Sequence, residues 1–186
     1  MNIPAYSLSE IEKLKPCKDR FAAVRSLKLG RGKITAKKAV EAGVSFDDLV
    51  WTASAIAKSD ADVERRLRLW LADVAAHVVH IFEKEHQTDF RPRNAIIAAR
   101  QFARGEIWDA ARDAARVAAL VAALVAARVA DWDAARAAAR AAAWDAARDA
   151  DWDVARDAEQ SWQLERLVYW FSENNPTDWP LPEPPQ

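Results

Sequence analysis

Four arginines between positions 91 and 104 could together bind an anion. Pro92 suits the first turn of a helix over RNAIIAARQFAR. On that helix Arg93, Arg100 and Arg104 fall within a stripe about 40° wide. Arg91 lies at the helix N-terminus, where free N–H groups favour anions. This spacing predicts a ligand site for phosphate or carboxylate. The competing interpretation, to which we give more weight, is ion pairing with acidic side chains of neighbouring helices, supplied in plenty by residues 108–186.

Acidic and histidine side chains also share one face of the preceding segment, DVAAHVVHIFEKEH. Asp73, His77 and His80 recur at helical spacing, with Glu83 and His86 beyond them. Metal ligands need such facing, but the spacing matches no specific signature such as HExxH, and one helix seldom supplies a complete site. We therefore expect no metal and no cofactor, and interpret the histidines as surface or half-buried side chains.

Residues 34–55, ITAKKAVEAGVSFDDLVWTASA, resemble the helix-turn-helix of bacterial repressors, and the basic N-terminal third suits DNA. The second helix would, however, place Asp47 and Asp48 where base and phosphate contacts belong. Acidic side chains repel phosphate. We expect a plain helix corner here, with DNA a disfavoured partner.

The residues offer little for catalysis. No histidine can be paired with Cys17 from the sequence, so a thiol nucleophile is not supported. Tryptophans 108, 132, 144 and 152 could stack on bases or sugars. As the large residues among alanines, they are better interpreted as packing wedges between helices. We expect a protein that is not an enzyme.

The elements that position these residues are predicted to be helical throughout. Alanine is frequent, only 4 glycines occur, and no stretch alternates like a strand. Helix signals recur along the chain. The expected starts are Ser7 or Ser9, Pro16, Thr35, Ser45, Asp60 or Asp62, and Pro92, and the expected stops are the glycines at 30–32, 43 and 105.

The longest of these helices should follow residue 60 and carry an apolar stripe at spacings of three and four. The stripe consists of Leu67, Trp70, Leu71, Val74, Val78 and Ile81.

Residues 108–159 form an internal repeat of four-residue units, beginning WDAA RDAA RVAA LVAA. Each unit advances its large residue by roughly 40° around a helix, so one straight helix cannot keep that row on a single buried face. We therefore expect two or three helices, broken at the aspartate-rich points 130–133 and 149–153, with residues 117–129 as a central helix. The predicted fold is an all-α multi-helix bundle with a long Ala-rich C-terminal helical segment.

Charge and composition divide the chain. The net charge is +6 over residues 1–44, −1 over 45–107 and −6 over 108–186. We predict basic N-terminal helices (1–44), a helical domain (45–172) containing the repeat, and a proline-rich tail (173–186). We expect the tail to be extended and exposed, with docking of Trp179 the less favoured outcome.

The chain is expected to be cytoplasmic. It has a single cysteine, no signal peptide is recognisable, and its longest uncharged apolar run, 117–127, is too short to cross a bilayer. No membrane partner is expected. A homo-oligomer is expected, because nine tryptophans and an apolar Ala-rich segment offer more apolar surface than one protomer covers.

From about Val44 to about Glu165 the chain resembles the immunity-five-like family of immunity proteins. The resemblance is carried by the helix RLRLWLADVAAHVVHIFEK, the segment DFRPRNAIIAARQFARGEI and the Ala-rich continuation. It implies a helical, non-enzymatic protein of bacterial toxin–immunity systems, whose relatives also occur in phages and prophages. The basic N-terminal third and the proline-rich tail depart from a minimal family domain.

The leading hypothesis is a stoichiometric binder, an immunity or counter-defence protein that neutralises a protein toxin or defence effector by holding it. The first alternative is sequestration of a nucleotide-type immune signal, an anionic small molecule, at Arg91, Arg93, Arg100 and Arg104. A helix-turn-helix regulator is the second alternative.

Overall fold

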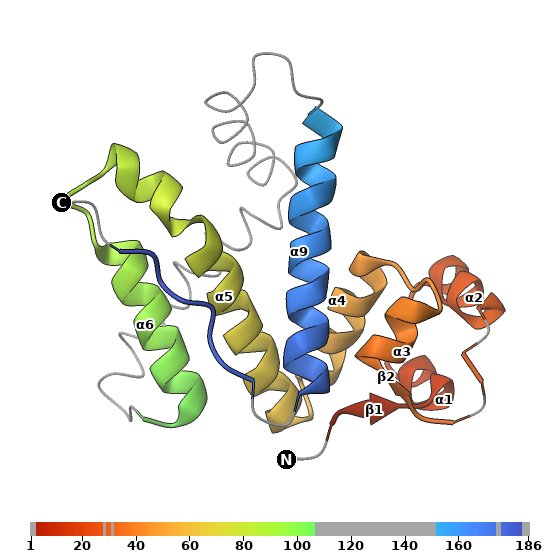
Figure 1. Cartoon of the computed structure of the whole chain (residues 1–186). Helices are drawn as coiled ribbons and strands as arrows, with labels where there is room; N and C mark the ends of the chain where they lie inside the picture. Colours follow the sequence, from red (N-terminus) through yellow and green to blue (C-terminus); the bar gives the residue numbers. More distant parts are fainter. Residues whose placement is uncertain (1–2, 28, 31, 107–151, 174–175, 184–186) are drawn as a thin grey trace. The chain divides into compact units, whose positions relative to one another are not determined.

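The computed structural model describes residues 3–27, 29–30, 32–106, 152–173 and 176–183 (Figure 1). Within these ranges the chain is mostly helical, with seven helices and one pair of two-residue strands. The predicted all-α class is confirmed. The Ala-rich tract up to residue 151, with its expected central helix and first expected break, lies outside the described residues. None of the described helices is long and apolar enough to cross a membrane.

The chain forms two compact units. Unit 1 comprises Met1–Leu67 and Leu164–Pro176, and unit 2 comprises Arg68–Gln163 and Thr177–Gln186. Each unit takes part of the long helix α5 (Ala61–Glu85) and part of α9 (Trp152–Ser172). Helix α9 is described from Trp152 onward, so the second expected break, at 149–153, lies partly outside the described residues and stays a prediction. The predicted domain division at residues 44 and 172, which depends on composition, stays a prediction.

Unit 1 contains four short helices whose starts follow their capping residues. They are α1 (Leu8–Glu12), α2 (Lys18–Ser26), α3 (Ala36–Glu41) and α4 (Phe46–Ile56). Ser7 forms a capping box with Glu10, and the side chains of Thr35 and Ser45 accept hydrogen bonds from backbone N–H groups three residues on. Three predicted starts are thereby confirmed.

Three features of unit 1 differ from expectation. Helix α2 begins at Lys18, two residues after Pro16. Helix α2 ends at Ser26, before the glycines, because Leu27 is already extended. Strands β1 (Ala5–Tyr6) and β2 (Ile34–Thr35) pair antiparallel, with Tyr6 opposite Ile34. Two residues are too few to produce an alternating pattern, so the sequence carries no signal for this pair.

Unit 2 contains most of α5 together with α6 (Arg91–Arg104), which ends at Gly105 as predicted. Alanines 72, 75, 76 and 99 pack with Val79 and Ile96 in its core. The side chains of Trp179 and Leu181 pack against this cluster. Figure 1 shows the C-terminal segment, in dark blue, running along α5 and α6. The described part of the tail contains no helix, as expected, but the expectation that it is exposed and that Trp179 does not dock is wrong, because Trp179 packs on the alanine-rich cluster.

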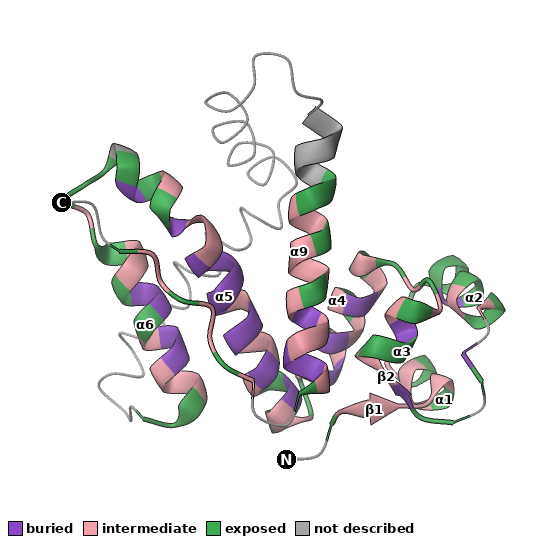
Figure 2. Cartoon of the chain, in the orientation of Figure 1, coloured by how far each residue is buried: buried purple, intermediate pink, exposed green. Residues whose placement is uncertain are grey.

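The buried face of α5 is rotated from the predicted apolar stripe (Figure 2). Trp70 and Val74 are buried as predicted, whereas the other four stripe residues are half-buried. Three charged residues, Arg66, Asp73 and Glu83, are buried on this helix. A buried charge needs a partner of opposite charge. The carboxylates of Asp73 and Glu83 pair with arginines outside α5.

Candidate functional site

The predicted arginine stripe lies on α6, and its most buried member is Arg100. Its guanidinium, 7% exposed as a residue, donates to the Asp73 carboxylate of α5 at 2.8 Å and to the Trp179 carbonyl at 2.7 Å. The Trp179 N–H donates to the same Asp73 oxygen at 2.9 Å. Asp73 is 0% exposed. The three groups form a closed set of hydrogen bonds that joins α5, α6 and the C-terminal segment.

Arg93 pairs with the second buried carboxylate of α5. Its Nε and NH2 donate to the two oxygens of Glu83 at 2.7 and 2.6 Å, a bidentate arrangement. Glu83 is 1% exposed. The hydrogen bond to Glu83 raises the pKa of Arg93 above its ordinary value. This pair ties the start of α6 to the last turns of α5.

Arg104 and Arg100 converge on one carboxylate of the C-terminal segment, Asp178. Arg104 forms an ion pair with it, and the Nε of Arg100 lies 3.5 Å from its second oxygen. The hydrogen bond to Asp178 raises the pKa of Arg104. Asp178 therefore adds a negative charge next to both Arg100 and Arg104.

Arg91 stands apart from the other three. Its guanidinium, 87% exposed, chelates Asp89 two residues earlier at 2.6 and 2.8 Å. These hydrogen bonds hold the pKa of the Asp89 carboxyl at about 2. The backbone N–H of Arg91 also donates to Asp89, so this carboxylate accepts a hydrogen bond from the first N–H group of α6.

Each of the four predicted site residues thus has an acidic partner within the chain. One partner, Asp178, comes from the acidic region that the ion-pair interpretation named; Asp73, Glu83 and Asp89 do not. Sequence reasoning did not find these acids as partners, although Asp73 and Glu83 were noted as metal candidates. Acids inside a long helix that also carries core alanines are the signal that could have found them. Anion binding at the stripe stays a prediction.

Two tryptophans of unit 2, Trp162 and Trp179, contact His77. Its ring stacks on Trp162 of α9 with centroids 3.7 Å apart, and Trp179 meets it edge-on at 5.5 Å. Its Nδ1 lies 3.2 Å from a carboxylate oxygen of Glu159. Burial raises the pKa of the Glu159 carboxyl. The hydrogen bonds with His77 and Gln163 lower it by more, so the pKa lies below its ordinary value.

On the face that carries Asp73, His77 and His80, the first two side chains are therefore used for pairing and packing. Asp73 binds Arg100, His77 is stacked, and His80 is exposed. Among the described residues no group of three or more histidine, cysteine, aspartate or glutamate side chains is placed to hold a metal ion.

The segment that resembles a helix-turn-helix forms α3, a turn at Gly43 and α4. Arg20 of α2 binds Asp48 at 2.7 Å and lies 3.7 Å from Asp47. The two acids that argue against DNA binding thus stand at the first turn of α4, next to a cation of their own unit.

Comparison with known proteins gives a family match that includes α5 and α6. Residues 58–148 match the model of the family described as Imm-5 like putative immunity protein. The resemblance predicted from the sequence is confirmed over this range, which lies inside the span of residues 44–165 expected for it. The match covers both helices and continues into the Ala-rich tract. No curated protein and no solved structure matches the chain.

Proposed function

We propose that this protein is a non-catalytic immunity or counter-defence protein that neutralises a protein toxin or defence effector by stoichiometric binding. The observation that carries the proposal is the family match over residues 58–148. The matched range includes the two helices that the buried ion pairs Arg100–Asp73 and Arg93–Glu83 join.

The ion pairs of α6 support a binding role because they hold the helix to its neighbours and leave a side of it next to the arginines exposed. Phe90 and Ile97 lie on this exposed side, the outer face of α6, and are 40% and 38% exposed. Asn94 lies between them and is exposed. Apolar side chains on a rigid helix, with polar neighbours, suit the centre of a protein interface. We assign the partner to this outer face of α6, defined by Phe90, Asn94 and Ile97.

Stoichiometric neutralisation is tested by titrating the toxin or effector encoded beside this gene with the purified full chain. We expect loss of toxin activity to reach its end point at a fixed molar ratio, with a complex of the same ratio in size-exclusion chromatography with light scattering. Neutralisation by a small fraction of an equivalent, with turnover, would mean an enzyme instead.

The outer face of α6 is tested by Ile97→Glu. A charge in the centre of an apolar interface should weaken the complex at least tenfold. Ile3→Glu is the matched control, because Ile3 is exposed to the same degree at 39% but belongs to unit 1. Equal effects of the two substitutions, or none from Ile97→Glu, would exclude this face.

A second candidate is sequestration of an anionic nucleotide-type signal at the arginines. Asp178 favours it, because one carboxylate faces both Arg104 and the Nε of Arg100, and a phosphate could take its place. Asp178→Asn should then increase affinity for such a ligand, and Arg104→Ala should weaken it while leaving the buried pairs of Asp73 and Glu83 intact. Thermal shift with a panel of cyclic nucleotides tests this; stabilisation of neither the native chain nor Asp178→Asn rejects it.

A further inference from the structure

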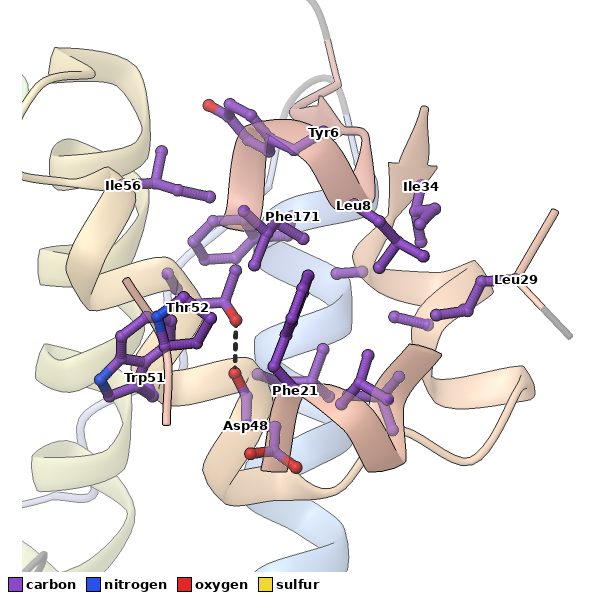
Figure 3. A pocket seen from close by; sticks show the side chains of 18 of the residues that line it. Tyr6, Leu8, Phe21, Leu29, Ile34, Asp48, Trp51, Thr52, Ile56 and Phe171 are labelled. Atoms are coloured by element: carbon purple, nitrogen blue, oxygen red, sulfur yellow. Dashed lines mark hydrogen bonds between the residues drawn. The ribbon is translucent and has the colours of Figure 1, made fainter. Parts of the chain in front are cut away.

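Unit 1 contains a cavity of about 360 Å³, which lies among α1 to α4, β2 and the ends of α5 and α9 that belong to this unit (Figure 3). Its walls are largely the apolar interior of the unit. The buried lining residues include Phe21, Leu29, Ile34, Leu49, Ile56 and Phe171. Figure 3 shows the rings of Phe21 and Phe171 facing the same space as Leu8 and Thr52. Ligand pockets combine such apolar walls with a few polar groups.

The charged groups at the cavity pair with one another and leave a net charge of −1. Among the described lining residues the charged ones are Arg20, Asp47 and Asp48, and the three form one ion-pair cluster. The Tyr6 hydroxyl donates to Asp60 at 2.7 Å and is used within the unit. An anion would leave water to meet a net negative charge here, and a cation would have to compete with Arg20 for the two aspartates, so both are disfavoured. The walls therefore select an uncharged molecule.

The Thr52 hydroxyl is one polar group of the wall that keeps capacity for a ligand. The Thr52 hydroxyl donates to the Asp48 carbonyl at 2.6 Å, and the dashed line in Figure 3 marks this bond. Its oxygen retains lone pairs that can accept one hydrogen bond. Beside it Trp51 is 41% exposed, and Cys17 at the rim is also exposed, so the cavity has an access from solvent.

The volume sets the size of the ligand. A dry cavity of about 150 Å³ in another protein holds benzene, so the present one has room for roughly a dozen non-hydrogen atoms. We propose that this cavity binds an uncharged, two-ring apolar molecule that donates a single hydrogen bond to Thr52. The inference is separate from toxin binding, because it concerns unit 1 alone.

The chemistry is tested by isothermal titration calorimetry of the full chain with 2-naphthol and, as its charged comparison, 2-naphthoate. We expect saturable one-to-one binding of 2-naphthol and binding of 2-naphthoate weaker by about tenfold or more. Absence of saturable heat up to the solubility limit of 2-naphthol, or equal affinity for both probes, would overturn the proposal.

The location is tested on α4, where two small neighbouring residues differ in exposure. Ala53 lines the cavity and is buried, whereas Ser54 is exposed and is not part of the lining. Ala53→Leu fills the space and should lower affinity for 2-naphthol at least tenfold, while Ser54→Leu, which adds the same side chain outside the cavity, should leave it unchanged. Thr52→Val, which keeps the shape but removes the acceptor, should weaken 2-naphthol severalfold.

If Ala53→Leu does not fold by circular dichroism, Ala39→Val on α3 provides the same test, since Ala39 also lines the cavity. Undiminished binding in a folded cavity-filling variant would show that 2-naphthol binds elsewhere and would contradict the assignment.

Discussion

At the scale of single residues, unit 2 depends on charges that are buried together. Asp73 and Arg100 have left water, so each relies on the other and on the backbone of Trp179. Removing one partner of such a pair leaves an uncompensated buried charge, which costs far more than losing an exposed pair.

We therefore expect Arg100→Met to lower the free energy of unfolding by about 3 kcal/mol or more. Arg91→Met is the matched control, because Arg91 is largely exposed in its pair with Asp89 and should contribute no measurable stability. Urea unfolding followed by circular dichroism measures both. Equal losses of unfolding free energy in the two variants would contradict the conclusion that the buried Arg100–Asp73 pair stabilises unit 2.

A second residue-scale contact is the hydrogen bond from Tyr6 to Asp60 in unit 1. This bond lowers the pKa of the Asp60 carboxyl below its ordinary 3.8, and Asp60 also accepts from the N–H groups that start α5. Burial, and then the same bond, raise the pKa of Tyr6 above 10.0. A carboxyl with a lowered pKa contributes stability above its unfolded pKa, and that contribution is lost as pH falls through the folded value.

Tyr6→Phe should accordingly raise the pKa of Asp60, as measured by an NMR titration, and reduce stability at pH 7 by about 1 kcal/mol. As pH falls from about 4 through the pKa of Asp60 in the folded chain, the native protein loses the stability that the lowered pKa contributes. This loss should be smaller in Tyr6→Phe, because the pKa of Asp60 is lowered less there. The alkaline loss that begins above pH 10, where an unfolded tyrosine ionises, should also diminish. An unchanged Asp60 titration would show that the bond does not form in solution.

At the scale of elements, the C-terminal segment acts as a strap on α5 and α6. The Trp179 side chain packs on the alanine-rich cluster and contacts His77 and Trp162. Its backbone N–H donates to Asp73, and its carbonyl accepts from Arg100. Its burial is partial, so its loss costs less than that of a fully buried tryptophan.

Trp179→Ala should lower unfolding free energy by about 2 kcal/mol and increase amide hydrogen exchange in α5 and α6. Glu183→Ala, an exposed residue of the same segment, should leave both unchanged. Native-like exchange in Trp179→Ala would mean that the strap adds nothing to the two helices.

Helix α6 ends where Gly105 adopts φ 73°, a left-handed conformation that residues with a Cβ resist. Gly105→Ala should destabilise by about 1 kcal/mol, whereas Gly105→Asn, a residue that tolerates this conformation, should cost less. Thermal unfolding ranks the three proteins. An alanine variant as stable as the native chain would contradict this description of the helix end.

At the scale of the whole molecule, the prediction concerns self-association. Phe82 of unit 2 is exposed outside the face assigned to the protein partner, and the chain carries +6 over residues 1–44 and −6 over 108–186. Apolar association does not weaken with salt, whereas association through opposite charges does.

We expect light scattering to give a mass above the 20.8 kDa of one chain, unchanged between about 50 mM and about 500 mM NaCl on the basis of Debye screening. A mass that falls with salt would indicate head-to-tail pairing of the charged ends. A mass of 20.8 kDa in both conditions would exclude the oligomer.

Local signals in the sequence determined much of this protein. Serine and threonine caps marked the starts of α1, α3 and α4, and Gly105 marked the end of α6, because these effects act within one helical turn. The sequence also predicted the family, because the resemblance depends on the order of residues along α5 and α6.

Only the tertiary structure decided which acids meet the arginines and where Trp179 lies. Asp73 pairs with Arg100 across 27 positions, and Trp179 donates to Asp73 across 106. A helical pattern states which side chains share a face, but it carries no information about which distant segment will cover that face. The choice of partner is made by burial, because a carboxylate that leaves water must be paired by whatever donors the fold brings to it.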